Sequence, residues 1–188
     1  MRHGEPVGGS KYRGNSIDDP LSELGWSQMR AAVKELNHWD AIVTSPMLRC
    51  LAFADEISQN LTVPLKIIDD FKEVGFGEWE GKTKEQVQMQ FAEEYKAFNI
   101  DPVLNRPSGA EVLQDFYDRV TLAIESVMST YQSEKRILII THAGVIRAAI
   151  ALFTNMPLAS MYKLEVSNAG LTSVLVKPDG IKLFYVNR

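Results

Sequence analysis

The sequence predicts an α/β fold: a single three-layer domain over residues 1–188 with a mostly parallel central sheet flanked by helices. Short apolar runs alternate with amphipathic stretches along the chain, as they do where strands alternate with helices. The length of 188 residues is close to that of one domain, and the 45% hydrophobic content is enough for a sizeable core. Neither long linkers nor internal repeats interrupt this pattern.

The first part of the chain predicts two helices and two strands. Residues 24–37 carry apolar side chains at helical spacing, and residues 40–44 predict a short buried strand. Ser45 and Pro46 open the next helix, because a proline suits a first helical turn, where its missing N–H is not needed. Residues 65–68 predict a second strand.

The middle of the chain predicts two more helical regions and the central strand. Helical periodicity returns over residues 87–98 and 112–131, with a proline-bearing loop over 99–109 between them. Residues 136–141 contain four consecutive aliphatic side chains, as expected of a strand that is buried on both faces. We expect residues 82–109 to form a cap or insertion over the functional site.

The C-terminal residues predict three strands, over 164–167, 171–177 and 181–186. Pro178, Asp179 and Gly180 predict the hairpin turn between the last two. Such strands offer an edge for pairing with a second copy of the chain, so the sequence leaves both a monomer and a homodimer open.

Composition and charge exclude several classes of protein. Cys50 is the single cysteine, which excludes an internal disulfide framework and a cysteine-based zinc site, and its apolar surroundings predict a core residue. The net charge of -4 provides no broad attraction for nucleic acid or an anionic membrane. No apolar run approaches the roughly 18 residues of a membrane span, and no apolar N-terminal segment resembles a signal peptide. We therefore expect a soluble, cytoplasmic protein that binds neither nucleic acid nor a membrane.

Two of the three histidines stand beside glycine-bearing turns. His3 lies between Arg2 and Gly4, and His142 follows an expected strand. Open α/β sheets bind ligands at the carboxyl ends of their strands, near helix N-termini that favour anions. Arg49 lies in the first turn of the helix that follows another expected strand, so we expect the two arginines and two histidines to converge at one edge of the sheet.

This set of side chains is suited to a phosphoryl group. The guanidinium group of arginine presents a fork of donors that matches phosphate oxygens. Neutral imidazole can attack phosphorus as a nucleophile. Phosphohistidine chemistry needs no metal and no cofactor, so the sequence predicts a small-molecule phosphomonoester as the partner and neither a metal site nor a cofactor site.

Six motifs in order resemble those of the histidine phosphatase superfamily, also called phosphoglycerate mutase-like, over nearly the whole chain. The motifs are Arg2-His3-Gly4-Glu5, residues 19–25, Thr44-Ser45-Pro46 with Arg49, residues 76–81, residues 107–111, and Thr141-His142-Ala143-Gly144. Within the family, residues 76–81, Tyr12-Arg13-Gly14 and the short chain are most similar to the α-ribazole phosphatase branch of cobalamin biosynthesis. The resemblance implies a phosphoglycerate mutase-like fold and a phosphoric monoester hydrolase of the histidine acid phosphatase type.

The resemblance also implies roles for individual residues. His3 matches the nucleophile that becomes phosphorylated, and Arg2, Arg49 and His142 match the residues that bind the phosphoryl oxygens. Glu73 matches the proton donor, and a carboxyl beside a phosphate is expected to hold a proton near neutrality.

We expect several other side chains in or near these motifs to have structural rather than catalytic roles. Glu78 and Glu80 are the rivals of the proton donor, and we expect them to be solvated or to stabilise a loop. Trp79 is expected to pack, and Glu111 to stabilise a helix start and help order the site arginines. His38 is expected to be a surface or helix-capping residue without a role.

Two departures from the family pattern bear on the site. A hydrophobic strand runs directly into the nucleophile in the family, whereas here only Met1 precedes Arg2, so we expect the natural protein to have apolar residues upstream. Many relatives carry an asparagine six residues after the nucleophile, where this chain has Gly9. We therefore expect Ser10 or Arg13 to supply that contact with the substrate phosphate.

Other functions fit the sequence less well. The favoured substrate is α-ribazole 5′-phosphate, by resemblance alone, and a broad-specificity or sugar-phosphate phosphatase stays open. A phosphoglycerate mutase and then a non-catalytic phosphate-binding module are the less favoured alternatives. Residues 4–11 approach the spacing of a nucleotide-binding P-loop, but Ser10 precedes Lys11 and no apolar-periodic helix follows.

Overall fold

A central sheet of three parallel strands organises the molecule. The computed structural model describes residues 1–36, 38–131, 135–177 and 180–188. The central sheet has the order β2-β1-β3, and a separate antiparallel pair is formed by β4 and β5. The strands are β1 (Ala41–Thr44), β2 (Leu65–Ile67), β3 (Ile137–Ile140), β4 (Ser173–Lys177) and β5 (Gly180–Tyr185). The predicted α/β class with a mostly parallel central sheet is confirmed.

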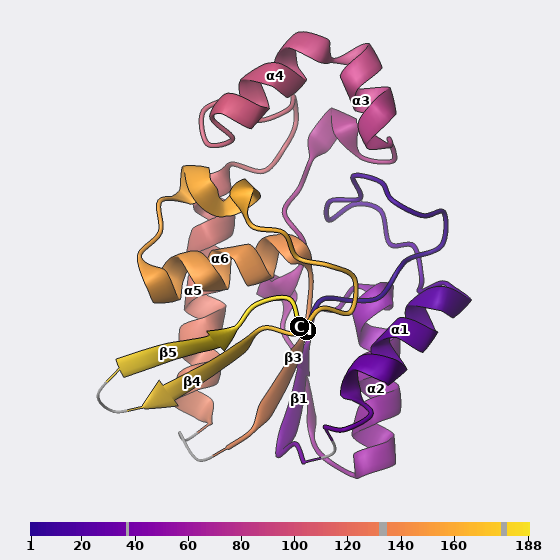
Figure 1. Cartoon of the computed structure of the whole chain (residues 1–188), viewed down its shortest axis with the longest axis vertical. Helices are drawn as coiled ribbons and strands as arrows, with labels where there is room; N and C mark the ends of the chain where they lie inside the picture. Colours follow the sequence, from indigo (N-terminus) through magenta and orange to yellow (C-terminus); the bar gives the residue numbers. More distant parts are fainter. Residues whose placement is uncertain (37, 132–134, 178–179) are drawn as a thin grey trace.

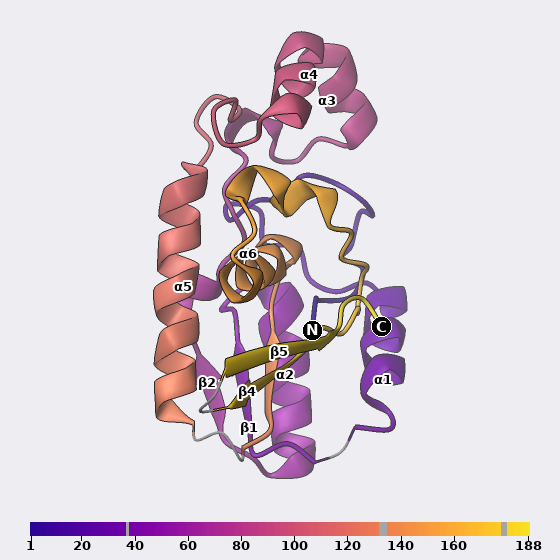
Figure 2. The same cartoon turned by 60° about the vertical axis from the view of Figure 1, so that its left-hand side comes forward.

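Helices cover both faces of this sheet (Figure 1). They are α1 (Glu23–Val33), α2 (Leu48–Leu61), α5 (Leu113–Thr130) and α6 (Ala143–Thr154). Two shorter helices, α3 (Lys84–Gln90) and α4 (Ala92–Ile100), lie beyond one end of the sheet, apart from these layers (Figures 1 and 2). The expected cap over residues 82–109 includes both.

The period of two along each strand divides the core into two layers. Ile42, Leu138 and Ile140 pack in the cluster that includes residues of α1 and α2. Val43 and Ile139 point the other way and pack with residues of α5 and α6. Strands β1 and β3 are therefore covered on both sides, as their uninterrupted aliphatic sequences predict.

The first residues of the chain lie beside the end of β3. The backbone N–H of His3 donates to the carbonyl of Thr141 at 2.9 Å, and the N–H of Thr141 donates to the carbonyl of Met1, also at 2.9 Å. Arg2 and Thr141 form a parallel bridge. On the other side, the N–H of Ala169 donates to the carbonyl of His3 at 3.1 Å. The site residues at the N-terminus are thus aligned with the central sheet by backbone pairing.

Two predicted helix ends are wrong. α1 ends at Val33 rather than at residue 37, which lies outside the described residues. The chain turns instead, so that Leu36 and Trp39 pack on the core and the Trp39 indole donates to the Leu36 carbonyl at 2.8 Å. α2 begins at Leu48 rather than at Pro46, with Met47 as its N-cap residue, and the side chain of Asp18 accepts the Leu48 N–H at 2.8 Å.

The strand predicted over 164–167 is also wrong, because side chains use its carbonyl groups. The guanidinium group of Arg147 donates to the carbonyl of Leu164 at 2.9 Å, and that of Arg2 donates to the carbonyl of Val166 at 2.5 Å. These carbonyls are therefore occupied outside any ladder. The hairpin joining β4 and β5 is present, but residues 178 and 179 of its predicted turn lie outside the described part of the chain.

Candidate active site

His3 lies at the carboxyl end of the sheet, where its backbone pairs with Thr141 and Ala169. A Cβ atom on Gly4 would lie 2.2 Å from the carbonyl oxygen of Gly25, so only glycine permits this close approach of two backbones. His3 is 5% exposed, and its Nδ1 lies 2.7 Å from the carbonyl oxygen of Gly4. A carbonyl can only accept, so Nδ1 carries the proton and Nε2 keeps its lone pair.

His142 lies beside it as the N-cap residue of α6. The rings of His3 and His142 meet edge to face with centroids 5.2 Å apart. Nε2 of His142 is 2.7 Å from the hydroxyl oxygen of Ser45, and the sulfur of Cys50 is 3.6 Å from the same nitrogen. The residue after β1 and the residues after β3 therefore meet, as expected where parallel strands end at one edge.

Both imidazoles are held neutral. Burial is the main cause that lowers the pKa of His3 and of His142 well below the ordinary value of 6.5. The next cause is the positive charge of Arg2 for the pKa of His3 and that of Arg49 for the pKa of His142. Cys50 is fully buried, and burial raises the pKa of its thiol to about 12, so it stays a thiol in the core, as predicted.

Arg2 and Arg49 each have one buried N–H donor without a hydrogen-bond partner in the part of the chain that the structure describes. The guanidinium group of Arg49 is 1% exposed and donates to the carbonyls of Ile17 at 2.9 Å and Gly14 at 3.1 Å. Nε of Arg2 and Nε of Arg49 are both buried, yet neither has a hydrogen-bond partner among the described residues. Burial also lowers the pKa of Arg2 to about 10, which still leaves it charged at neutral pH. Unpaired buried N–H groups on charged side chains are costly, and an anion would satisfy them.

Of the two candidates for the missing asparagine contact, only Arg13 is buried among the other cations. Ser10 is exposed on its loop. Arg13 is 7% exposed, and its positive charge contributes to the lowered pKa of His3, Arg2 and Arg49. Its Nε donates to a carboxylate oxygen of Asp19 at 2.9 Å. The structure thus brings Arg13 to the site and leaves Ser10 at the surface.

Glu73 lies at the N-terminus of α6. Its carboxylate accepts the backbone N–H of Gly144 at 3.1 Å and that of Val74 at 3.0 Å. Gly144 is two residues after His142, so this carboxyl group lies at the same helix N-terminus as His142, and its negative charge acts on the pKa of Arg2 and of Arg49. A negative group is favoured at this end of a helix.

The rival carboxylates are not at this position, as predicted. Glu78 is exposed. Glu80 stabilises a loop, since its carboxylate accepts the N–H groups of Phe76 at 2.8 Å and Ser16 at 3.2 Å. Trp79 is fully buried and packs with the aromatic core, also as predicted.

Glu111 precedes α5, but its expected help in ordering the site arginines is wrong. Its carboxylate pairs with Arg119 instead, at 2.7 Å, and accepts the N–H of Gly75 at 3.0 Å.

Two residues near the site were not predicted from the sequence. Arg119 was missed, and Ser45 was interpreted only as part of a motif and of a helix start. The position of Ser45 inside a family motif was the one available signal for its contact with His142.

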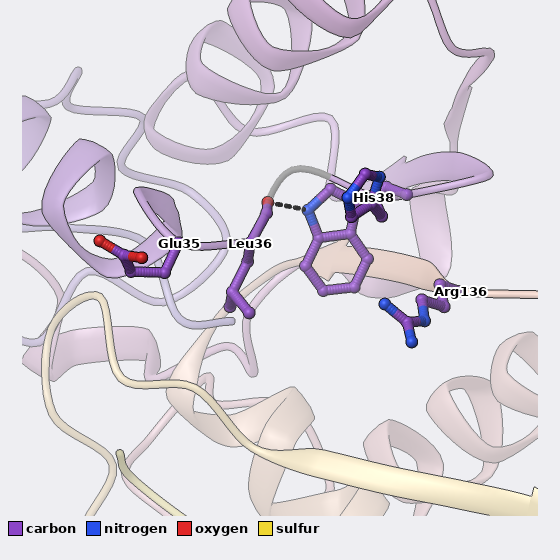
Figure 3. Close-up of a pocket in the computed structure, with 5 residues that line it drawn as sticks. Glu35, Leu36, His38 and Arg136 are labelled. Atoms are coloured by element: carbon purple, nitrogen blue, oxygen red, sulfur yellow. Dashed lines mark hydrogen bonds between the residues drawn. The ribbon is translucent and has the colours of Figure 1, made fainter.

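His38 lies away from this cluster, exposed beside a hollow of about 70 Å³ (Figure 3). Glu35, Leu36, Trp39 and Arg136 line the hollow with it. Residues 35–39 lead into the amino end of β1, and Arg136 directly precedes β3, so the hollow lies at the end of the sheet opposite to His3 and His142. His38 is therefore a surface residue, as predicted.

The residues that the structure describes contain neither a clustered metal site nor a helix that could span a membrane. No group of three or more histidine, cysteine or acidic side chains there is arranged to hold a metal ion. Among the helices of the same residues, none has the length and apolar character needed to cross a membrane.

Known proteins are similar to this chain over most of its length. The family model for the histidine phosphatase superfamily (branch 1) matches residues 1–188. A putative phosphoserine phosphatase 2 of Hydrogenobacter thermophilus is 28% identical, over 92% of this chain and 85% of its own length. The adenosylcobalamin/alpha-ribazole phosphatase of Salmonella typhimurium is 29% identical, over 88% of this chain and 83% of its own. The solved structure of the alpha-ribazole phosphatase from Shigella flexneri superposes with a TM-score of 0.83 at 27% identity, over 100% of this chain and 94% of that one.

Proposed function

Because this chain belongs to the histidine phosphatase superfamily, branch 1, and is a phosphatase, we propose that it hydrolyses phosphomonoesters through a phosphohistidine at His3. One observation carries the proposal. The imidazole of His3 is neutral, and its Nδ1 proton is committed to the carbonyl of Gly4. The lone pair of Nε2 is therefore free. The positive charges of Arg2 and Arg49 help to lower the pKa of His3, and the Nε donors of both have no partner among the described residues.

In the first step, Nε2 of His3 attacks the phosphorus atom while the bond from phosphorus to the leaving oxygen breaks. Arg2, Arg13, Arg49 and His142 bind the other phosphoryl oxygens, whose charge they stabilise in the transition state. Glu73 in its acid form gives its proton to the leaving oxygen, so the product departs as a neutral alcohol.

In the second step, water attacks the phosphorus atom of phosphohistidine. The carboxylate of Glu73 takes a proton from this water, and the phosphorus–nitrogen bond breaks with its electron pair returning to Nε2. Inorganic phosphate leaves, and both His3 and Glu73 are restored. Every group in this cycle is a side chain of the chain itself, and no metal takes part in it.

We propose α-ribazole 5′-phosphate as the substrate. Support comes from Tyr12-Arg13-Gly14 and residues 76–81, which are most similar to that branch, and from the relatives named as α-ribazole phosphatases. A specific comparison favours phosphoserine as the second candidate, because a relative of similar identity is named a putative phosphoserine phosphatase.

Phosphate release in the presence of EDTA tests both levels of the proposal. The substrates are α-ribazole 5′-phosphate, phosphoserine, sugar phosphates and p-nitrophenyl phosphate, and the proteins are the wild type, His3→Ala and the matched control His38→Ala. We expect turnover that is lost in His3→Ala and kept in His38→Ala, with the highest kcat/KM for α-ribazole 5′-phosphate. A preference for phosphoserine would keep the mechanism and overturn the substrate. Full turnover by His3→Ala would overturn the mechanism.

A further inference from the structure

Arg119 on α5 forms hydrogen bonds with the backbone of residues 70–73, the segment that ends at Glu73. Its Nη1 donates to the carbonyl of Asp70 at 2.5 Å and to that of Lys72 at 3.0 Å. Its Nη2 donates to the carbonyl of Glu73 itself at 3.2 Å. One guanidinium group therefore binds three carbonyls within four consecutive residues.

Glu111 holds that guanidinium group from the other side. Its carboxylate oxygens accept Nε of Arg119 at 2.7 Å and Nη2 at 3.0 Å, so the pair is bidentate. The same carboxylate accepts the N–H of Gly75, two residues after Glu73. The guanidinium group also lies over the ring of Phe116, with its central carbon 4.8 Å from the ring centroid. Arg119 and Glu111 together thus bind the backbone on both sides of Glu73.

The side chain of Glu73 has its own anchor, in the N–H of Gly144. The carboxyl group would point correctly only if the backbone that carries it is fixed as well, because a displacement of about 1 Å at a reacting group can cost about 10²-fold in rate. The side chains of Arg119 and Glu111 are about one-fifth exposed, so water competes little for these bonds.

The geometry points to Arg119 and Glu111 as positioning residues for proton transfer, which set the place of the Glu73 carboxyl without touching the substrate. This inference rests on the proposed role of Glu73 as the proton donor. Lysine keeps the charge but lacks the planar fork, and it cannot bind Glu111 in bidentate fashion and three carbonyls at once. Arg119→Lys is therefore expected to loosen the segment while the fold is retained.

A pair of substrates separates proton transfer from other effects. p-Nitrophenyl phosphate releases a stabilised anion that needs no proton, whereas β-glycerophosphate releases an alkoxide that does. The quantity to compare is the ratio of kcat/KM for the aryl substrate to kcat/KM for the alkyl substrate, because kcat/KM reports the steps up to formation of phosphohistidine. Inhibition by inorganic phosphate and the melting temperature are measured for each variant as well.

We expect Glu73→Gln to raise this ratio by about 10²-fold, as for the loss of a general acid. Arg119→Lys and Glu111→Gln should raise it by about tenfold, with inhibition by inorganic phosphate changed by less than about twofold, which corresponds to a displaced but present acid. The matched control is Arg30→Lys, which alters an exposed arginine bound by two hydrogen bonds to Glu56 and should leave the ratio unchanged.

The outcomes distinguish the inference from the proposal on which it rests. If Glu73→Gln shifts the ratio and both other variants lower the two kcat/KM values equally, Arg119 and Glu111 are structural only and the inference is overturned. If Glu73→Gln leaves the ratio unchanged, the acid is misassigned and the inference fails with it. A ratio raised in all three variants, with phosphate inhibition intact, supports it.

Discussion

Gly144 provides a sharp test of the site geometry, because a single added methyl group would meet the proposed acid. A Cβ atom at position 144 would lie 2.2 Å from Oε1 of Glu73 and 3.2 Å from Cζ of Phe116. Gly144 is in the first turn of α6, where alanine is otherwise the better helix former by about 1 kcal/mol. The substitution Gly144→Ala should therefore displace the end of one flexible side chain rather than unfold the protein.

The expected loss of activity follows from that contact. Ordinary van der Waals separation requires the carboxylate to move by about 1 Å, and a displacement of this size at a reacting group costs about 10²-fold, or about 2.7 kcal/mol of transition-state stabilisation. The N–H of Gly144 also loses its acceptor at 3.1 Å. Phosphate binding should change little, since Arg2, Arg49 and His142 are not displaced.

The assay is kcat/KM for β-glycerophosphate and for p-nitrophenyl phosphate, with thermal unfolding of the same samples. We expect Gly144→Ala to lose about 10²-fold on the alkyl substrate, less on the aryl substrate, and to keep its melting temperature within a few degrees. His38→Ala is the control, because His38 is exposed and lies at the opposite end of the sheet. Unchanged activity on β-glycerophosphate in Gly144→Ala would refute the assigned position of the acid.

Three further predictions concern charge and loop stability. The pKa of buried His3 is lowered, so the neutral imidazole contributes its full stability above pH 6.5 and loses it as the pH falls toward the folded pKa. His3→Gln should therefore flatten the decrease in unfolding free energy between pH 6 and 5 by about 1.4 kcal/mol per pH unit. Equal slopes for the two proteins in urea titrations would contradict this. Arg49→Lys should weaken inhibition by inorganic phosphate by about 30-fold, or about 2 kcal/mol, because it removes the buried unpaired Nε donor; an unchanged inhibition constant would exclude Arg49 from the phosphate site. Glu80→Gln should cost about 1 kcal/mol of stability through its bonds to Phe76 and Ser16 and leave the aryl-to-alkyl ratio alone; a raised ratio would make Glu80 the acid.

The sequence was sufficient to bring the two histidines and Arg49 together. His142 and Arg49 each follow a strand with uninterrupted aliphatic residues, and parallel strands of one sheet end at one edge. Local patterns and the topology of the fold class are enough to place them there. His3 was added because Gly4 follows it as Gly144 follows His142, although the structure places His3 beside β3 by backbone pairing rather than in a turn.

Features that depend on contacts between distant segments could not be predicted. The strand expected over 164–167 does not form because Arg2 and Arg147, which are far away in the sequence, bind the carbonyls of Val166 and Leu164. Arg119 belongs to none of the motifs. Its hydrogen bonds to the carbonyls of Lys72 and Glu73 form only when α5 packs against that segment. The need for glycine at position 144 likewise arises from a side chain 71 positions earlier.

Direct detection of the phosphorylated residue tests the central claim most sharply. Wild-type protein, Glu73→Gln and His3→Asn are mixed with p-nitrophenyl phosphate, quenched at alkaline pH within the first turnover, digested and analysed by mass spectrometry. We predict one phosphoryl group on the N-terminal peptide at His3, more abundant in Glu73→Gln, where attack by water is slowed, and absent in His3→Asn. A phosphoryl group on a different residue, or turnover by His3→Asn at the wild-type rate, would contradict it.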